Sequence, residues 1–531
     1  MYMKKLTRQV LCNHTAPIVD TPKGKLRGLK SEDLYLFRGI QYATAGRFRQ
    51  PEPVAPWEGV RDAVKYGYTC PELEPRNIND QFNVPHMFYP QSEDCLYLNV
   101  FTTSLDRDAK KPVMVWFHGG GYACGAGMDH YAYDGENMAE YGDVVVVTVN
   151  HRLNVLGHLD LSAYGEEYAN SGNAGIADLI AALQWVQENI VCFGGDPDRV
   201  LIFGQSGGGG KVMTLMQSPR ADGLFHRAVV QSGTIEPPAV DVLRKMAART
   251  AELVLEEAGL TPEQVHELDT MPYAQLADAA LRASSRLAAE TGRRAMWQPV
   301  PDGVNYLGYP TEVGFRKENA HVPMMFGTVF AEFTSNFDEA FGDNWKNSWT
   351  DEETERRLAK QYGGAAEGIK AAFRQAYPGR NVADAVFMDA FVRPVTIRVA
   401  KQRAAFTDAG TWLFLFDYES PYNDGVLAWH NAEIPFIFHN AAHIEASYIP
   451  GVADRVQDEM CGAWCAFART GKPNGDKLPE WPPVSAEHAP TMLYTNDVSQ
   501  ALVNHDAALM AAIPGGIIQP PFIRSLEEEE A

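Results

Sequence analysis

Three short apolar runs in the first half of the chain predict buried strands. Pro112–Phe117, Val144–Val149 and Val200–Phe203 are continuously apolar and rich in β-branched or aromatic residues. A strand with one face in water alternates apolar and polar residues, whereas a central strand of a parallel sheet is apolar on both faces. Between the last two runs, Ala177–Ile190 has apolar residues at helical spacing, and Phe193–Pro197 breaks this helix. The alternation of strands and helices predicts an α/β fold with a mainly parallel sheet.

Helical periodicity dominates two later blocks, at about residues 241–290 and 351–407. In the first block, Thr261–Gln264 offers an N-cap threonine, a proline at the first helical position and a capping-box glutamine. Such blocks can roof an active site or serve as ordinary packing helices, and the sequence leaves both roles open. The strand-like run Trp412–Phe416 returns the chain to the sheet.

The boundaries of these patterns predict the organisation of the chain. We expect an N-terminal extension over residues 1–18, a single domain over 19–524 and an acidic tail over 525–531. The basic N-terminal residues are followed by polar residues instead of an apolar run, so we expect no export signal and a cytoplasmic location.

The overall charge and composition exclude several classes of function. The 531 residues have a net charge of −22, which disfavours binding to nucleic acid or to an anionic membrane surface. No run approaches the ~18 consecutive apolar residues of a membrane-spanning helix. Seven cysteines spread over this length do not form the pattern of a disulfide scaffold.

One serine has the sequence context of a catalytic nucleophile. Ser206 lies in Gly204-Gln-Ser-Gly-Gly208, between the apolar run Val200–Phe203 and a predicted helix. This context is typical of a nucleophile elbow, a sharp strand-to-helix turn in which neighbouring side chains would clash. The segment superficially resembles a phosphate loop, but Gln205 and Val212 stand where that motif requires glycine and serine or threonine.

A second glycine-rich segment follows another predicted strand. His118-Gly-Gly-Gly-Tyr122 comes directly after the run that ends at Phe117. Exposed backbone N–H groups in such a loop can stabilise the negative oxygen of a tetrahedral intermediate. We expect Gly120, Gly121 and Gly207 to donate to this oxyanion. The alternative is a glycine-rich turn without chemistry.

Together these motifs resemble the type-B carboxylesterase and cholinesterase branch of the α/β-hydrolases. Phe193–Gly208 is similar to the serine signature of that family, and Glu93–Val100 is similar to its second signature. Phe37–Ala43 and Asn150–Asn154 also resemble family segments, and the likeness runs from about residue 19 to 481. The resemblance implies a large, mostly parallel sheet flanked by helices, with inserted helical segments over the active site.

The resemblance also implies the other two members of a catalytic triad. His430 lies in a segment similar to the histidine motif of the family, and Glu332 in one similar to its acid motif. The family places a supporting serine at the position of Ser232. Phe333 stands where a glycine is usual, which makes Asp338 the alternative acid.

The family pattern suggests several residues around the substrate. Gln205 replaces a glutamate found in many relatives, which removes a carboxylate that would favour cationic substrates. We expect the pocket to be lined by aromatic side chains at four positions, which are Tyr122, Trp297, Phe333 and Trp429. Secreted relatives join the positions of Cys70 and Cys95 by a disulfide, whereas we expect thiols in a reducing cytoplasm.

We therefore expect a serine carboxylesterase that hydrolyses small-molecule esters through an acyl-enzyme intermediate. Amide, lactone and carbamate hydrolysis by the same residues are alternatives, as is a non-catalytic binding module. We expect no cofactor and no metal, because His439 and His443 have a chelating spacing but no third ligand beside them. The sequence leaves the natural ester and the oligomeric state open.

Overall fold

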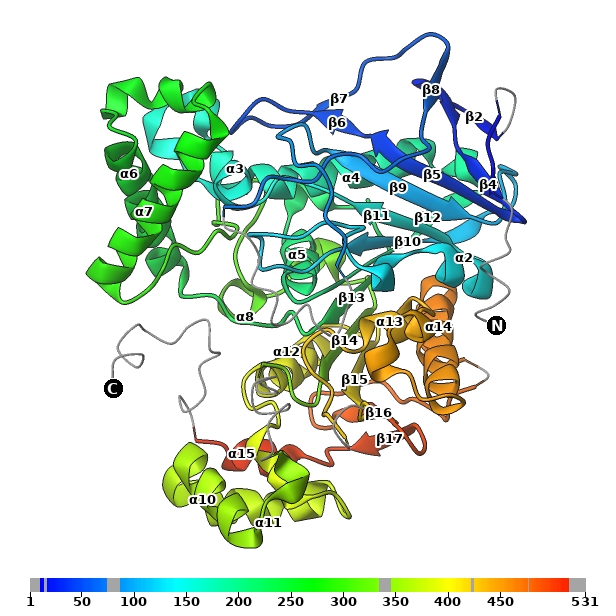
Figure 1. The fold of residues 1–531 in the computed structure, drawn as a ribbon, viewed down its shortest axis with the longest axis vertical. Helices are drawn as coiled ribbons and strands as arrows, with labels where there is room; N and C mark the ends of the chain where they lie inside the picture. Colours follow the sequence, from blue (N-terminus) through cyan, green and yellow to red (C-terminus); the bar gives the residue numbers. More distant parts are fainter. Residues whose placement is uncertain are drawn as a thin grey trace. The chain divides into compact units, whose positions relative to one another are not determined.

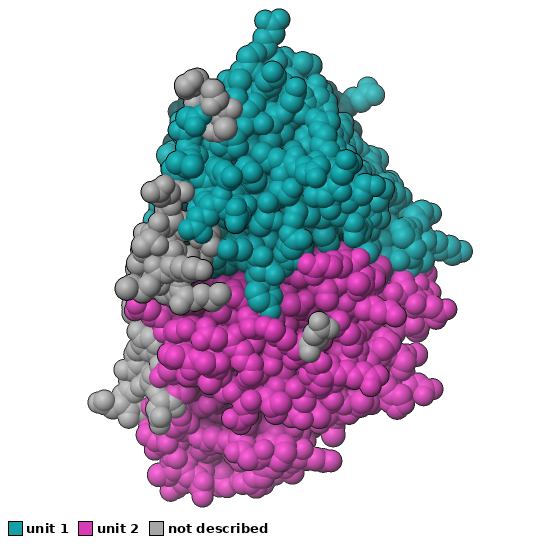
Figure 2. Space-filling model, turned by 90° about the vertical axis from the view of Figure 1, so that its right-hand side faces the viewer, with its two compact units in different colours: residues 1–76, 86–322 teal, residues 77–85, 323–531 magenta. Residues whose placement is uncertain are grey.

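The protein is described here by a computed structural model that covers residues 10–13, 17–73, 86–333, 345–421, 425–475 and 477–514. The chain divides into two compact units (Figure 2). Unit 1 comprises residues 1–76 and 86–322, and unit 2 comprises residues 77–85 and 323–531. The predicted acidic tail at residues 525–531 lies outside the described residues.

Unit 1 contains a twisted sheet with an antiparallel and a parallel half (Figure 1). Its strands lie in the order β1 (Val10–Leu11), β4 (Leu29–Ser31), β5 (Leu34–Gln41), β9 (Tyr97–Thr102), β11 (Val145–Val149), β10 (Lys111–Phe117), β12 (Gly195–Gln205) and β13 (Arg227–Gln231). Neighbours from β1 to β11 pair antiparallel, and neighbours from β11 to β13 pair parallel. Strand β1 lies within the predicted N-terminal extension.

The three predicted central strands are confirmed as β10, β11 and β12. Every residue of β11 is buried, and so are the last six residues of β10 and β12. Parallel pairing sets Phe117 at the end of β10 opposite Gly204 near the end of β12. The two glycine-rich segments therefore leave the sheet side by side at one edge. Strand β12 begins at Gly195, five residues earlier than predicted, because β10 and β12 already pair at Lys111 and Gly195 before a register shift.

The helices of unit 1 confirm most of the predicted pattern. Helix α4 (Ala174–Asn189) precedes β12, and α5 (Gly207–Met216) follows it. The stretch Glu166–Phe193 is long and apolar enough to cross a membrane, but 72% of its most apolar window is buried inside the protein. That burial is typical of a core helix in a globular fold. Shorter helices are α2 (Glu136–Gly142), α3 (Asn154–His158) and α8 (Pro310–Val313).

The first predicted helical block is a helical hairpin in unit 1. Helices α6 (Val240–Glu257) and α7 (Tyr273–Thr291) pack side by side (Figure 1). Between them, Thr261 N–H donates to Gln264 Oε1 at 3.1 Å. The predicted capping box is thus confirmed, but it opens a 3₁₀ helix, η7 (Pro262–Asp269), instead of an α-helix.

Short strands form two further sheets in unit 1. The three-stranded sheet contains β2 (Ile18–Thr21), β3 (Gly24–Arg27) and β8 (Val60–Asp62), and the two-stranded sheet contains β6 (Ala43–Thr44) and β7 (Glu52–Pro53).

The described part of unit 2 contains four strands in the order β14 (Met324–Val329), β15 (Thr411–Asp417), β16 (Pro490–Thr495) and β17 (Gln500–Val503). The first three pair in parallel, and β17 is antiparallel to β16. The predicted strand Trp412–Phe416 is confirmed as β15, whose seven residues are all buried.

The second predicted helical block is confirmed in unit 2. It contains α10 (Asp351–Tyr362), α11 (Ala366–Ala376) and α12 (Val392–Phe406). Helix α12 contacts β14 and β15, which makes it a packing helix of the sheet, while α10 and α11 contact each other. The other helices of unit 2 are α13 (Ile434–Ile437), α14 (Val452–Thr470) and α15 (Ala507–Ala512).

A buried histidine at the end of α3 makes the stability of the fold depend on pH. His158 is 4% exposed, and its Nδ1 lies 3.2 Å from the Gly172 carbonyl oxygen. Burial lowers the pKa of His158 from 6.5 to about 3. Between these two values the unfolded chain binds a proton that the folded chain does not. The free energy of unfolding therefore falls as the pH falls, by about 1.4 kcal/mol per pH unit for this group.

We expect His158→Gln to lose that contribution. Between pH 7 and pH 5, urea denaturation of the variant should show a smaller fall in unfolding free energy than the wild type. The difference should be about 2 kcal/mol in total, because the unfolded imidazole binds its proton only as the pH falls through ~6.5. His266→Gln, at an exposed histidine, is the matched control and should keep the wild-type slope. An unchanged slope in His158→Gln would contradict the prediction.

Candidate active site

Ser206 occupies a sharp turn between β12 and α5. Its backbone has φ 57° and ψ −125°, a conformation that residues other than glycine rarely adopt. The Ser206 N–H donates to the Gln231 carbonyl of β13 at 2.8 Å, which fixes the turn to the neighbouring strand. Strain of this kind persists only where the surrounding structure holds it, and it is common at functional sites. The predicted nucleophile elbow is therefore present in the backbone.

The glycines around Ser206 allow the backbone of α5 to approach the sheet. A Cβ on Gly208 would lie 2.0 Å from the Phe117 carbonyl oxygen at the end of β10. A Cβ on Gly204 would lie 2.5 Å from the Gly208 carbonyl carbon. Both contacts are with backbone atoms, which cannot swing aside as a flexible side chain can. Only glycine fits at these two positions.

The second glycine-rich segment lies directly against this elbow. A Cβ on Gly119 would lie 3.5 Å from Ser206 Cβ, and one on Gly207 would lie 2.5 Å from the Gly121 nitrogen. Gly120 and Gly121 have φ values of 87° and 59°, which glycine adopts without strain. Gly207 begins α5, where the first N–H groups have no intrahelical acceptor. The structure thus brings the three predicted oxyanion donors, Gly120, Gly121 and Gly207, together beside Ser206.

In unit 2, Glu332 and His430 form a close pair. His430 Nδ1 lies 2.5 Å from Glu332 Oε2, and the His430 N–H donates to the Glu332 carbonyl at 2.9 Å. A parallel bridge between Ala331 and Trp429 holds the two segments in this register. The Glu332 side chain is 1% exposed and that of His430 is 19% exposed. The alternative acid, Asp338, lies outside the described residues.

A further carboxyl group beside Glu332 is not apparent from the sequence motifs. Asp389 accepts hydrogen bonds from the backbone N–H groups of residues 391, 392 and 393 at the start of α12. Burial, and then the charge of Glu332, raise the pKa of Asp389 to about 7. The other oxygen of Glu332, Oε1, accepts from the Val329 N–H at 3.0 Å. An aspartate before a helix is a visible capping signal, but its nearness to Glu332 is a tertiary contact.

The four predicted pocket aromatics lie in different surroundings. Tyr122 packs on the first turn of α5, with its hydroxyl 3.4 Å from Thr214 Oγ1. The Phe333 ring lies 4.2 Å from the His430 ring, and Trp429 is buried immediately before His430. Trp297 instead lines a small cavity with residues of α6 and the end of α3. No residue of the elbow or of the Gly119–Gly121 loop lines that cavity. A pocket role for these four aromatics stays a prediction.

Two predicted supporting residues are buried near the elbow. Ser232 is completely buried with φ 48°, and its hydroxyl has no hydrogen-bond partner among the described residues. Its predicted contact with Glu332 stays a prediction. Gln205 Oε1 would lie 3.4 Å from a Cβ on Gly119, so this side chain packs beneath the glycine loop.

Cys70 and Cys95 are buried thiols and are not joined by a disulfide. Leu153 N–H donates to Cys70 Sγ at 3.2 Å. A hydrogen bond with Cys70, together with burial, raises the pKa of Cys95. The Cys95 thiol is therefore protonated at neutral pH.

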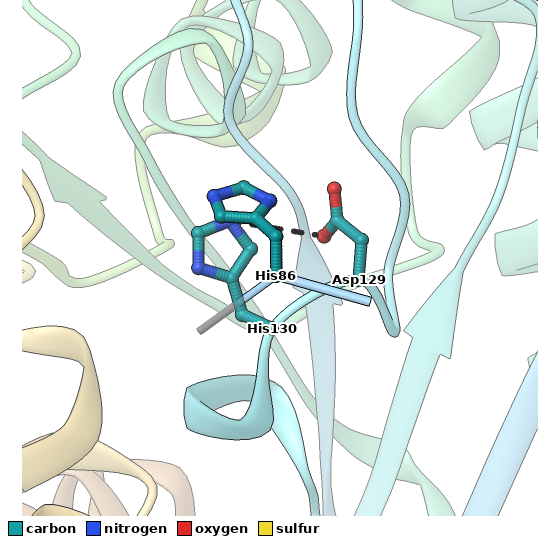
Figure 3. Close-up of side chains that lie close together, drawn as sticks. All are labelled: His86, Asp129 and His130. Carbon is teal, nitrogen blue, oxygen red and sulfur yellow. Dashed lines mark ion pairs between the residues drawn. The ribbon is translucent and has the colours of Figure 1, made fainter. Parts of the chain in front are cut away.

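One cluster in unit 1 has donors that could hold a metal ion. Ligand atoms of His86, Asp129 and His130 lie within 4.8 Å of one another (Figure 3). The two imidazole rings lie 3.7 Å apart, and His130 Nε2 is 3.9 Å from Asp129 Oδ1. Three donors bound to one ion at ~2.1 Å would lie about 3.5 Å apart, so these side chains would have to close in on it.

Comparison with known proteins identifies the fold and the family. A profile of the Carboxylesterase family matches residues 15–510. This chain belongs to the carboxylesterase family. The para-nitrobenzyl esterase of Bacillus subtilis (strain 168) is 34% identical over 506 residues, which cover 91% of this chain and 96% of the relative. The phenmedipham hydrolase of Pseudarthrobacter oxydans is 34% identical over 502 residues, with the same coverage of both chains.

Solved structures show the same relationship. An esterase from anaerobic Clostridium hathewayi that can hydrolyze aliphatic aromatic polyesters has a TM-score of 0.87 and 42% identity, covering 96% of this chain and 99% of its own. A carboxylesterase of Geobacillus stearothermophilus has a TM-score of 0.71 and 33% identity, covering 94% and 100%. The predicted α/β-hydrolase fold, the family resemblance and the class of carboxylic ester hydrolase are therefore confirmed.

The backbone contact at Gly208 makes a direct test of the elbow. We expect Gly208→Ala to destabilise the protein by about 3 kcal/mol or more, because its Cβ would overlap the Phe117 carbonyl. Urea denaturation measures the loss, and esterase activity per folded molecule should fall with it.

The matched control is Gly368→Ala on α11, where a Cβ meets no atom within 4 Å. This exchange should raise stability by about 0.5–1 kcal/mol, because alanine is the better helix former. Similar stabilities of the two variants would contradict the description of the elbow.

Proposed function

We propose that this carboxylesterase uses Ser206 as its nucleophile. The observation that carries the proposal is the elbow. In this turn Ser206 has a strained backbone and lies just before α5, against the triglycine loop formed by Gly119–Gly121. A serine at such a turn exposes its hydroxyl at the edge of the sheet. Attack of Ser206 Oγ on an ester carbonyl would form a tetrahedral intermediate, which collapses to an acyl-enzyme and an alcohol. Water then hydrolyses the acyl-enzyme.

His430 and Glu332 are proposed as the base and the orienting acid. An N–H at His430 Nδ1 would donate a hydrogen bond to Glu332, which leaves Nε2 free of hydrogen and able to accept the Ser206 proton. The same imidazolium would then protonate the leaving alcohol. The buried Glu332 carboxylate stabilises this cationic form without taking its proton. The close pairing of the two side chains supports these roles over a role for Asp338.

The N–H groups of Gly120, Gly121 and Gly207 are proposed as the oxyanion hole. Their positions beside Ser206 support this role, because a fixed set of donors needs no reorganisation when negative charge develops on the substrate oxygen. Ser232 is proposed to support Glu332, because its buried hydroxyl has no hydrogen-bond partner among the described residues.

We propose small neutral esters with an aromatic group as the substrates. The name of the para-nitrobenzyl esterase supports this class, as do Tyr122, Phe333 and Trp429, which are proposed to line the pocket. Gln205 places an uncharged amide next to Ser206 in the sequence, where a carboxylate would favour a cationic substrate. Amide, lactone and carbamate substrates remain the alternatives for the same catalytic residues.

The cytoplasmic location of the protein stays a prediction.

Aliphatic aromatic polyesters are a second candidate substrate. The esterase of Clostridium hathewayi can hydrolyze them, and it is 42% identical to this chain in an alignment that covers 96% of this chain. The chemistry at the carbonyl would be that of a small ester. The additional requirement is access of a polymer chain to Ser206.

The nucleophile and the acid can be tested by two substitutions. We expect Ser206→Ala to lower kcat for 4-nitrophenyl butyrate by ~10³-fold or more, and Glu332→Gln by ~10³–10⁴-fold, since the neutral amide no longer stabilises the imidazolium. A fluorophosphonate probe should label the wild type at Ser206 and leave Ser206→Ala unlabelled, as mass spectrometry would show.

Ser285→Ala, at an exposed serine of α7, is the control and should keep wild-type activity and labelling. Substantial activity in Ser206→Ala would refute the proposed nucleophile.

Substrate class can be tested with a series of esters. We expect kcat/KM to be highest for soluble 4-nitrophenyl esters of short or medium acyl length and low for emulsified long-chain triglyceride. A film of an adipate–terephthalate polyester, assayed for released terephthalate by chromatography, tests the second candidate. Preference for long-chain triglyceride would overturn the proposed class, and no release from the film would exclude polyesters alone.

A further inference from the structure

Lys211 is a completely buried lysine on α5, five residues after Ser206. The mechanism proposed above assigns no role to Lys211. A buried ammonium group loses its hydration, so an apolar side chain of the same length would be the less costly choice at such a position. The burial of Lys211 therefore requires a compensating interaction.

That interaction is a hydrogen bond to the triglycine loop. Lys211 Nζ donates to the His118 carbonyl oxygen at 2.8 Å, the one hydrogen bond this ammonium makes among the described residues. The His118 carbonyl belongs to the same planar peptide unit as the Gly119 N–H. Because the unit is planar and trans, a group that fixes the oxygen also fixes the direction of the N–H on its other side. Lys211 thus sets the orientation of the first peptide of the loop.

The next two peptide units are held in the same way by other groups. His118 Nδ1 lies 2.9 Å from the Gly119 carbonyl oxygen. The Gly120 carbonyl accepts from the N–H groups of Ala123 and Cys124 at 2.9 and 3.1 Å. These contacts orient the N–H groups of Gly120 and Gly121. Three consecutive glycines have no side chains to restrict their backbone. The conformation of this loop therefore depends on the hydrogen bonds that its carbonyl oxygens accept.

The aromatic residue after the glycines is also held near Lys211. Lys211 Nζ lies 5.7 Å from the centre of the Tyr122 ring, within the range of a cation–π interaction. The Tyr122 hydroxyl contacts Thr214 on the next turn of α5. Lys211 therefore contacts both ends of the loop from α5, the helix that follows Ser206.

We propose that Lys211 is a positioning residue that clamps the triglycine loop onto the nucleophile elbow and so pre-organises the oxyanion hole. This inference rests on the proposed function, because it gives the loop its oxyanion role. Lys211 acts through the His118 carbonyl and does not touch the substrate. Its loss should weaken stabilisation of the transition state more than binding of the ground-state ester.

The test compares Lys211→Met, which keeps the length and removes the donor, with the wild type. With 4-nitrophenyl butyrate, we expect kcat to fall ~10–100-fold and KM to stay within about threefold. A trifluoromethyl ketone adds to the serine and carries an oxyanion, so its inhibition constant should rise in proportion to the loss of kcat/KM. Lys477→Met, at an exposed lysine paired with Asp458, is the control and should change none of these values.

A second variant distinguishes the loss of the Lys211–His118 hydrogen bond from a general loss of folding. Lys211→Arg keeps a cationic donor and should recover at least a third of the lost kcat if the bond to the His118 carbonyl is what matters. Hydrogen exchange of the peptide covering residues 118–124 should be faster in Lys211→Met than in the wild type, while exchange in α7 is unchanged.

The two proposals fail in different ways. A folded Lys211→Met variant with wild-type kcat and inhibitor affinity would overturn the proposed role of Lys211. Unchanged hydrogen exchange of residues 118–124 in that variant would overturn it as well. If Lys211→Met does not fold, failure of Lys211→Arg to retain inhibitor affinity in proportion to its kcat overturns it as well. Activity that persists in Ser206→Ala overturns the proposed function itself, whatever Lys211 does.

Discussion

The close approach of backbone to backbone at the ends of β10 and β12 is the constraint on which the site depends. Parallel pairing places Phe117 opposite Gly204, so the chain leaves both strands at the same level of the sheet. Helix α5 can then start against β10 only because Gly208 has no side chain. The same approach places the triglycine loop directly against the turn at Ser206. Strain at one residue is thus supported by the buried strands on either side.

Buried charge is the second theme of this site. Lys211 is surrounded by groups that water does not reach, and burial lowers its pKa to about 7. His151 stacks on His118 with ring centres 5.0 Å apart, and burial together with the charge of Lys211 lowers the pKa of His151. Because Lys211 is completely buried, its hydrogen bond to the His118 carbonyl is electrostatically stronger than it would be in water. Burying ionisable groups such as Lys211 and His151 lowers the stability of the fold. Their presence is therefore consistent with a role in function.

The acid and histidine depend on a different kind of contact. Glu332 and His430 are 98 residues apart, yet one short parallel bridge sets their segments side by side. Phe333 packs on the imidazole, although family likeness alone made a glycine the expected residue there. The departure from the family pattern therefore adds a ring contact to the histidine and leaves the pairing with Glu332 intact. Asp389 lies close enough for the charge of Glu332 to raise its pKa.

The sequence by itself determined the features that depend on neighbouring residues. Continuous apolar runs specify buried strands, and glycines around Ser206 and after His118 specify the two turns, because local sterics and burial decide both. It also determined the family, through motifs that span most of the chain. Only the tertiary structure decided that Lys211 reaches the His118 carbonyl and that Asp389 lies beside Glu332. It also placed Glu332 against His430, a pairing that the family resemblance had implied. Those contacts follow from the register of strands and the packing of helices, which join residues far apart in the chain and leave no periodic signal in the sequence.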